Sequence, residues 1–404
     1  MTTRLLQDPP ARVTEGSPVV TRRSLLKGAA VAGATVVVAG SGLLSYRVYD
    51  QMVLDPDHGH AFEAWRQWRS APGPLGAVGA AILAANPHNT QPWVFVVGGT
   101  SIDVHADRRR QTGALDALGR ELHLGLGCAL ENLVLAARAR GLEPTVTLLP
   151  SGPTGDHVAH VELAPASPVS SPLYDAIGGR HSNRGPYRAE PVPPDLLARL
   201  VDTTGLPGVG VHWLTGTAAN AAMGGLLVDA AIAITVDAQQ SRDAFGWFRS
   251  TDDAIQRHRD GLTLDGQGLS PLMLTAAKLL PPSTRSSGDA FWVDQTRTVH
   301  TRTAAAYGVL TVVDPDDEAS QLLGGRLLQR VHLAATAEGV ALQHMNQITE
   351  RIDRERATQA TPTFAPRFAR LLPAGVQPLA AFRVGYAVRA ARLSPRRSLA
   401  AVTR

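Results

Sequence analysis

Two stretches of the chain match each other at an offset of 198 residues: LAARARGL at residues 135–142 and LAATAEGV at residues 333–340. Each is typical of an alanine-rich helix that stops at a glycine, because glycine readily adopts the left-handed conformation that closes a helix. One such match can arise by chance. However, a proline-initiated helix followed by a strand with a tryptophan, Trp93 or Trp213, also occurs in each half. Together these observations predict a duplicated domain.

The first half alternates helix and strand patterns. A proline opens a small apolar run that ends at Asn86-Pro87, which predicts a closely packed helix. Two apolar runs flank Gly98-Gly99 and predict a hairpin. A later helix pattern stops at Gly141. We therefore expect helices over 74–85 and 122–139, and strands over 93–97, 102–105, 145–149 and 157–163.

The second half repeats this plan and adds a long insertion. We expect helices over 193–201 and 327–337, and strands over 209–214 and 308–313. Residues 218–303 begin as a long helix and continue as Gly/Pro/Ser-rich sequence, which is typical of an insertion or lid. A Pro/Ser-rich linker at 164–171 separates the halves. The predicted division is a terminal segment 1–45, a first half 46–170 and a second half 171–404.

Composition excludes several classes of protein. A chain of 404 residues with 44% hydrophobic and 18% charged residues can bury a core and is not disordered in bulk. Its single cysteine, Cys128, excludes an intramolecular disulfide, a thiolate zinc finger and a cysteine-ligated iron–sulfur cluster. The net charge of +4 comes without a long basic run, so no nucleic-acid partner is expected. The basic residues are mostly arginine, which suits anion binding but is also what GC-rich coding produces.

The N-terminal segment is typical of a twin-arginine export signal. Arg22-Arg23 lies in TRRSLLK (21–27), and a weakly apolar run of small residues follows at 28–44. The run is marginal for a membrane span. Export through the twin-arginine machinery would place the folded protein outside the cytoplasm. An uncleaved membrane anchor, and a chance arginine pair before a buried helix, are the alternatives.

Three polar segments are candidates for ligand binding. The loop NPHNTQPW (86–93) is held extended by two prolines and presents amide and hydroxyl groups, which can pair with a planar heterocycle. RHSNR (180–184) places two arginines around a serine, a donor set that suits a phosphate monoester. SPRR (394–397) is a second basic cluster. Taken singly, the loop is better explained as a capped helix end, and each basic cluster as a solvated face.

Together these segments resemble the nitroreductase family of flavin-binding proteins. Arg180, Ser182 and Arg184 match its phosphate motif, and Arg396 and Arg397 match its C-terminal basic pair. The loop matches the segment that lies against the flavin ring, with His88 in place of the usual serine. The resemblance implies an α+β, nitroreductase-like fold with FMN as cofactor. It assigns cofactor binding to Pro87, His88, Asn89, Gln91, Arg180, Ser182, Arg184, Arg396 and Arg397.

The order of the motifs is reversed relative to ordinary members, because the ring loop precedes the phosphate motif. Two tandem halves would then form one intramolecular site, with a lid over the flavin. This arrangement, together with Asp107, Arg108 and Arg120-Glu121, is similar to the Acg-type subfamily of actinobacterial nitroreductase-like proteins. Its members resemble a homodimer folded from one chain. The resemblance implies a monomer with one composite FMN site.

We therefore expect an FMN-dependent oxidoreductase that takes electrons from NAD(P)H and reduces a small molecule. Flavin N5 would carry the chemistry, so no catalytic side chain and no metal ligand are assigned. That agrees with the lack of a recognisable triad, zinc-protease motif or carboxylate pair. The alternative within this class is a protein that stores FMN without catalysis. A zinc hydrolase using His58, His60 and His88 is disfavoured, because no acidic general base lies at a recognisable spacing.

Overall fold

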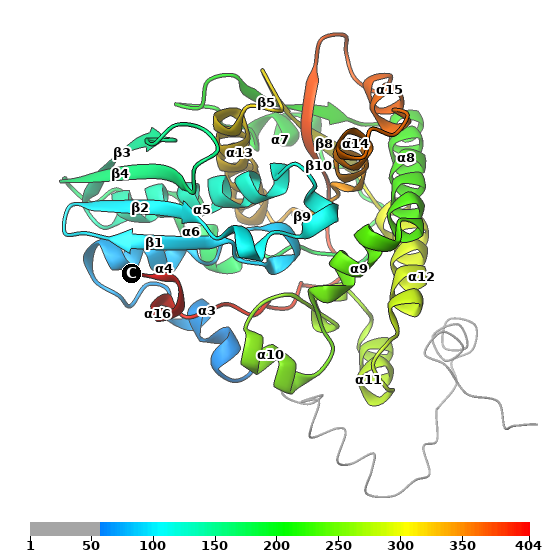
Figure 1. Cartoon of the computed structure of the whole chain (residues 1–404), viewed down its shortest axis with the longest axis horizontal. Coiled ribbons are helices and arrows are strands. Elements are labelled where there is room, and N and C mark those ends of the chain that lie inside the picture. Colours follow the sequence, from blue (N-terminus) through cyan, green and yellow to red (C-terminus); the bar gives the residue numbers. More distant parts are fainter. Residues whose placement is uncertain (1–56) are drawn as a thin grey trace, which may run out of the picture.

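The computed structural model describes residues 57–404, which fold into a mixed α+β structure (Figure 1). The expected export signal at residues 1–45 lies outside the described residues. Ten strands are defined: β1 (Trp93–Val97), β2 (Ser101–Ala106), β3 (Leu142–Leu148), β4 (His157–Pro165), β5 (Val209–Leu214), β6 (Phe248–Arg249), β7 (Leu262–Thr263), β8 (Ala306–Val312), β9 (Ala341–His344) and β10 (Gln377–Gly385).

Eight of these strands form two four-stranded antiparallel sheets with the same connectivity. The strand orders are β1-β2-β4-β3 and β5-β8-β10-β9. In both sheets the first strand pairs with the second, the second with the fourth, and the fourth with the third. The α+β class and the duplication expected from the sequence are confirmed.

Two long helices form the centre of the molecule. α5 (Arg120–Ala139) and α13 (Glu318–Ala337) each have 20 residues, and each joins the second strand of its sheet to the third. A Cβ atom on Gly127 would lie 2.2 Å from the Leu322 carbonyl oxygen, and one on Gly325 would lie 2.2 Å from the Leu124 carbonyl oxygen. Both residues of one contact are shifted by 198 positions in the other. This reciprocity is what a two-fold interface produces.

A buried polar cluster joins the same two helices. Glu131 accepts hydrogen bonds from Arg326 Nε at 2.8 Å and from Arg330 Nε at 2.6 Å. Next to it, Gln329 Nε2 donates to Asn132 Oδ1 at 2.8 Å. An unpaired buried charge is costly. These pairs therefore hold the two helices in one position relative to each other, in addition to the glycine contacts described above.

Shorter helices surround the two sheets and the central pair. They are α3 (Glu63–Gln67), α4 (Gly73–Ala81), α6 (Pro172–Ala176), α7 (Pro194–Arg199), α14 (Gln347–Ala357), α15 (Phe364–Ala369) and α16 (Leu399–Val402). Trp65 and Trp68 are each 7% exposed and belong to the main hydrophobic core.

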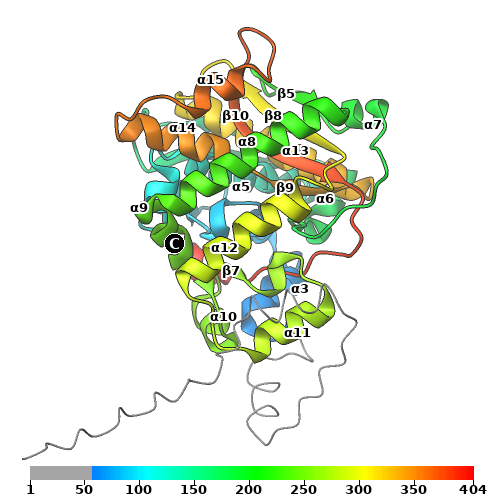
Figure 2. The same cartoon turned by 90° about the vertical axis from the view of Figure 1, so that its right-hand side faces the viewer.

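The insertion forms a helical layer along one side of the molecule (Figure 2). It contains α8 (Thr217–Val236), α9 (Ala238–Gly246), α10 (Asp252–His258), α11 (Pro271–Leu279), α12 (Arg285–Gln295) and a π-helix (Thr296–His300). The sequence predicted irregular structure after the first helix. The short helices form because side chains cap their N-termini, as Ser270 does for α11 and Thr284 for α12. By length and composition alone α8 could cross a membrane, but it packs against α14 and α9.

Several element boundaries differ from the prediction. α4 ends at Ala81 rather than at 85, and the chain continues in turns to the polar loop. α13 begins nine residues before the predicted 327, because Asp317 caps its N-terminus by accepting from the Ser320 amide at 2.8 Å. Strands β9 and β10 and helices α14 to α16 were not predicted.

Replacing Gly127 by alanine should lower the free energy of unfolding by about 1–3 kcal/mol, because the new methyl group overlaps backbone atoms that cannot rotate away. Chemical denaturation of wild type and variant measures this. Gly225→Ala on α8 is the control. A Cβ there meets nothing within 4 Å, so the change should be neutral or should stabilise by about 0.5–1 kcal/mol. Equal effects of the two substitutions would contradict the assigned contact.

Candidate cavity between the central helices and the insertion

A cavity of about 520 Å³ lies between the core and the insertion, within the range typical of small-molecule sites. The core contributes residues from α5, β9, the start of α14 and the loop that follows α4. The insertion contributes the other wall, which is largely apolar and aromatic. Its main apolar side chains are Phe245, Phe248, Met273, Phe291 and Trp292. The expected lid therefore covers a cavity.

The polar loop at residues 86–93 forms one edge of this cavity through Asn86, Pro87 and His88. Its backbone is strained, because His88, Asn89 and Gln91 have φ angles of 46°, 55° and 53°. Few residues other than glycine adopt this left-handed region, and such positions persist only where surrounding contacts impose them.

Asn89 and Gln91 supply these contacts rather than facing the cavity. Asn89 Nδ2 donates to the carbonyl oxygens of Gly261 at 3.1 Å and Pro395 at 2.9 Å. Gln91 Nε2 donates to the Arg259 carbonyl at 2.8 Å. Both amides therefore fasten the loop to the insertion and to the C-terminal segment. Their assignment to the cofactor stays a prediction.

The C-terminal arginine pair has a similar structural role. Arg396 donates to the carbonyl oxygens of Leu83 and Ala84, each at 3.3 Å, and its guanidinium lies 4.9 Å from the centre of the Trp65 ring. The Arg397 amide donates to Gln91 Oε1 at 2.8 Å. Neither side chain lines the cavity, although Arg396 is only 2% exposed.

The RHSNR segment reaches the cavity in part. Ser182 and Arg184 line it, whereas Arg180 is buried behind the wall and donates to the Leu83 carbonyl at 2.9 Å. Arg184 donates to the Gly266 carbonyl at 3.2 Å. Thus, of the nine residues expected to bind the cofactor, the structure places Pro87, His88, Ser182 and Arg184 on the cavity surface.

Positive charge at this end of the cavity is not balanced by acidic groups. Within residues 57–404, no carboxylate pairs with Arg180, Arg184 or Arg396. Burial, with Arg184 nearby, lowers the pKa of His88 to about 4, and burial with Arg180 nearby lowers the pKa of His344 to about 3. Both imidazoles are therefore neutral at pH 7. Since buried cations usually have partners, this end of the cavity is suited to an anion.

Two acidic side chains lie together at another part of the cavity wall. Glu121 on α5 and Glu350 on α14 line the cavity, and Glu121 interacts with Glu350 and Asn346. Burial, with Asp116 nearby, raises the pKa of Glu121 to about 8. Burial next to Glu121 raises the pKa of Glu350 well above its usual range. At neutral pH the Glu121 carboxyl is mostly protonated.

Sequence reasoning noted Glu121 but missed this role. The sequence signal for this role was a carboxylate, Glu121, inside an otherwise apolar helix pattern. Its partner Glu350 on α14 lies in a region where the sequence predicted no helix or strand. Nearby, Asp353 is paired with Arg120 through two hydrogen bonds of 2.6 and 2.7 Å. Asp116 accepts from the amides of Glu121 and Leu122 at the start of α5.

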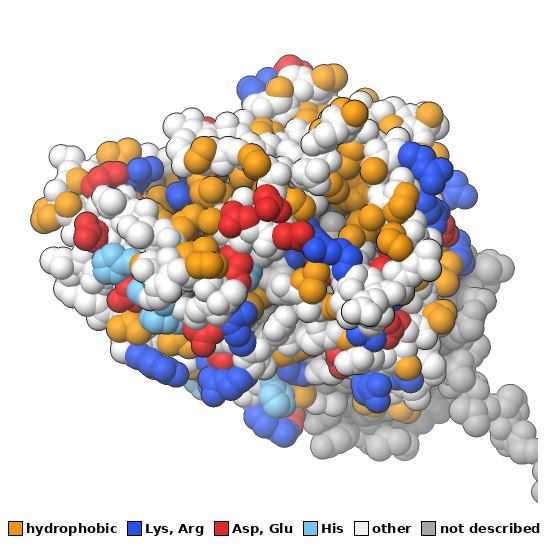
Figure 3. All heavy atoms as spheres, turned by 45° about the horizontal axis from the view of Figure 1, so that its top comes forward, with side chains coloured by type: hydrophobic (Ala, Val, Ile, Leu, Met, Phe, Trp, Pro, Cys, Tyr) orange, Lys and Arg blue, Asp and Glu red, His pale blue; other side chains and the backbone are white. Residues whose placement is uncertain are grey.

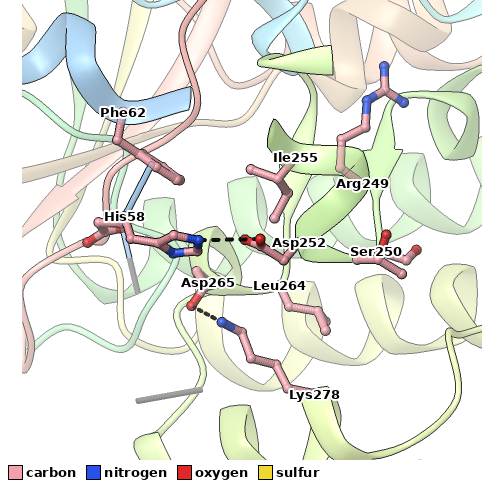
Figure 4. Close-up of a pocket in the computed structure, with 11 residues that line it drawn as sticks. His58, Phe62, Arg249, Ser250, Asp252, Ile255, Leu264, Asp265 and Lys278 are labelled. Carbon is pink, nitrogen blue, oxygen red and sulfur yellow. Dashed lines mark ion pairs between the residues drawn. The ribbon is translucent and has the colours of Figure 1, made fainter. Parts of the chain in front are cut away.

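The structure does not bring the three histidines of the zinc-hydrolase alternative to one point. His58 pairs with Asp252 at 3.3 Å beside a small pocket between the core and the insertion (Figure 4). His60 pairs with Glu63 at 2.6 Å, and His88 lines the large cavity. In the same close-up, Lys278 pairs with Asp265 at 2.9 Å. These separate partners give that alternative no shared metal position.

The raised pKa of Glu121 predicts how stability depends on pH. Because its folded pKa of about 8 lies above the ordinary 4.5, the native state holds a proton that the unfolded chain has released. The associated stability is complete below pH 4.5 and is lost as the pH rises through about 8. Glu121→Gln should reduce this loss between pH 5 and 8 by roughly 1–3 kcal/mol.

Urea unfolding at several pH values measures the effect. Glu143→Gln provides the control, because its carboxylate lies on the surface with 53% of the side chain exposed and should leave the profile unchanged. A Glu121→Gln profile that matches the wild type across this range would show that Glu121 is ionised in the folded protein.

Comparison with known proteins finds relatives that are named as nitroreductases. No family model matches the chain. "Putative NAD(P)H nitroreductase Rv3131" from Mycobacterium tuberculosis is 28% identical over 328 residues, which cover 80% of this chain and 88% of that protein. "Putative NAD(P)H nitroreductase acg" from the same organism is 33% identical over 131 residues, covering 32% of this chain and 39% of that protein.

Solved structures with similarity include the FMN-dependent nitroreductase NfnB from Mycobacterium smegmatis in complex with NADPH. It is 17% identical, has a TM-score of 0.36, and covers 58% of this chain and 97% of its own. The sequence similarity to the Rv3131 protein extends over most of both chains, and it supports the nitroreductase family that the motifs predict.

Proposed function

We propose that this chain is an FMN-dependent oxidoreductase of the nitroreductase type that uses NAD(P)H. The observation that carries the proposal is Arg184. Its guanidinium lines a ligand-sized cavity beside Ser182 and has no carboxylate partner within residues 57–404. A phosphate monoester carries nearly two negative charges at neutral pH and would supply the missing counter-charge.

The residues of the cavity fit FMN in other respects. His344 Nε2 is buried without a hydrogen-bond partner among the described residues, and His344 lines the cavity. The strained edge at Asn86–His88 offers polar groups beside an apolar wall, which suits a flat heterocycle. When bound, FMN supplies hydride exchange at its N5 atom. The relatives named as NAD(P)H nitroreductases support this choice of electron donor.

The chain's own residues would then perform three tasks. Arg184 and Ser182 bind the phosphate. Phe245, Phe291 and the rest of the insertion wall exclude water from the cavity. Glu121, which lines the cavity, holds a proton on its carboxyl group because burial raises its pKa to about 8. A hydride acceptor also needs a proton, and a protonated carboxyl in the wall can donate one.

A single site per chain follows from the broken symmetry of the two halves. By the 198-residue offset, Cys128 in the cavity wall corresponds to Arg326 on α13. Cys128 lines the cavity, whereas the longer Arg326 does not line it and donates to the buried Glu131 at 2.8 Å. This supports a monomer of the Acg type, in which one chain takes the place of a homodimer and binds one FMN.

The decisive experiment is a titration of FMN and riboflavin into the flavin-free full chain. We expect one FMN per chain. Arg184→Ala should weaken FMN binding roughly ten- to a hundred-fold, because one charge-assisted hydrogen bond contributes about 1.5–3 kcal/mol. Riboflavin, which lacks the phosphate, should bind both proteins similarly. Arg188→Ala is the matched control, since its side chain is 59% exposed.

Addition of NADH or NADPH to the FMN-bound protein then distinguishes an oxidoreductase from an FMN-storage protein. Loss of the oxidised flavin absorbance supports the oxidoreductase, while an unreactive bound flavin would instead support FMN storage. An Arg184→Ala variant that still prefers FMN over riboflavin as strongly as the wild type would place the phosphate elsewhere.

For location, we propose export of the folded protein by the twin-arginine pathway, on the basis of TRRSLLK at residues 21–27. The signal depends on the arginine pair rather than on charge alone. Replacing Arg22 and Arg23 by lysine should therefore retain the protein in the cytoplasm. Cell fractionation checks this, and an unchanged distribution of the variant would exclude the pathway.

A further inference from the structure

A histidine and carboxylate cluster lies on the outer face of the first sheet, on strands that do not line the cavity. Asp103 Oδ1 on β2 lies 2.9 Å from His157 Nε2 and 2.6 Å from His160 Nδ1, both on β4. The three ligand atoms all lie within 4.8 Å of one another. Histidine and acidic side chains gather over the part of the molecule where Figure 1 places β1 to β4 (Figure 3).

A β-bulge is what brings the two histidines together. Residues 157 and 160 are an odd number of positions apart, so in a regular strand their side chains would point to opposite faces. The register of β2 and β4 shifts between Val104 and His105, so that His105 pairs with His157 while Val104 pairs with Ala159. The extra residue, Val158, is buried, and His157 turns to the outer face beside His160.

The surroundings leave the cluster available to a cation. Within residues 57–404, the ion-pair partners of Asp103 are these two histidines, and no arginine or lysine neutralises it. Arg108, which lies nearby in sequence, pairs with Asp156 at 2.7 Å instead. The side chains of Asp103, His157 and His160 are 27%, 24% and 32% exposed, so an ion can reach them from solvent.

We propose that Asp103, His157 and His160 form a binding site for a divalent transition-metal ion of the zinc type. Two imidazoles and one carboxylate are a ligand set that suits such ions. The second ring nitrogen of His157 lies 3.5 Å from the Ser151 hydroxyl, which orients the ring with Nε2 toward Asp103. The ring of His105 is stacked on that of His157, with 4.6 Å between the ring centres, and it lies outside the group of three ligand residues.

The geometry needs only a small adjustment. Ligand atoms at about 2.1 Å from a tetrahedral zinc ion lie roughly 3.4 Å apart. The two hydrogen bonds of Asp103 are shorter than this by less than 1 Å. A slight rotation of these partly buried side chains therefore admits the ion, and the two imidazole protons that it displaces are released to solvent. Since the ligands come from both β2 and β4, the bound ion would connect neighbouring strands.

The test is calorimetric titration of Zn²⁺ into the full chain after removal of bound metal, with Co²⁺ absorption as an independent measure of nitrogen ligation. We expect one high-affinity ion per chain. Asp103→Asn and His157→Ala should each weaken it at least about tenfold, and the ion should raise the melting temperature of the wild type but not of the variants.

His258→Ala is the control, because it removes an exposed histidine on α10 that is not part of the cluster. Circular dichroism confirms that each variant is folded. Wild-type protein that binds no zinc, or zinc binding that is unchanged by both cluster substitutions, would overturn the proposal.

Discussion

The close approach of α5 and α13 is the constraint on which the rest of the structure depends. At Gly127 and Gly325 the helices meet without intervening side chains, since a Cβ at either position would lie 2.2 Å from a carbonyl oxygen of the other helix. This contact sets the distance between the two sheets and brings Glu131 within reach of the arginines of α13. Because the halves are not identical, a symmetric contact supports an asymmetric molecule, in which the large cavity lies beside the insertion.

Charge divides that cavity into two regions. Near Arg184 the field is positive, and burial keeps His88 neutral by lowering its pKa to about 4. Near Glu121 the carboxyl is kept protonated, because burial raises its pKa to about 8. Neither region holds a full negative charge at neutral pH. The cavity therefore favours an anionic group near Arg184 and a neutral hydrogen-bond acceptor near Glu121.

Local signals were enough to predict the hairpin of β1 and β2, the helix α5 and the strand β5. The largely buried β10 and the helices α14 and α15 gave no such signal, since they are stabilised mainly by packing against other elements. The same distinction applies to the site. A motif names Arg180 and Arg184 together, but the surrounding fold directs one to the Leu83 carbonyl and the other to the cavity. The metal-site proposal depends on strand register, which periodicity does not reveal.

The strained loop shows how distant parts of the chain determine the cavity edge. Each left-handed residue other than glycine costs on the order of 1 kcal/mol, and hydrogen bonds of about 1 kcal/mol each offset this cost. Asn89 exchanges two hydrogen bonds with Gly261 of the insertion, and Gln91 accepts from the Arg397 amide near the C-terminus. The loop conformation is thus imposed by segments that follow it by more than 160 positions. The insertion therefore encloses the cavity and, together with the C-terminal segment, also determines the shape of the opposite wall.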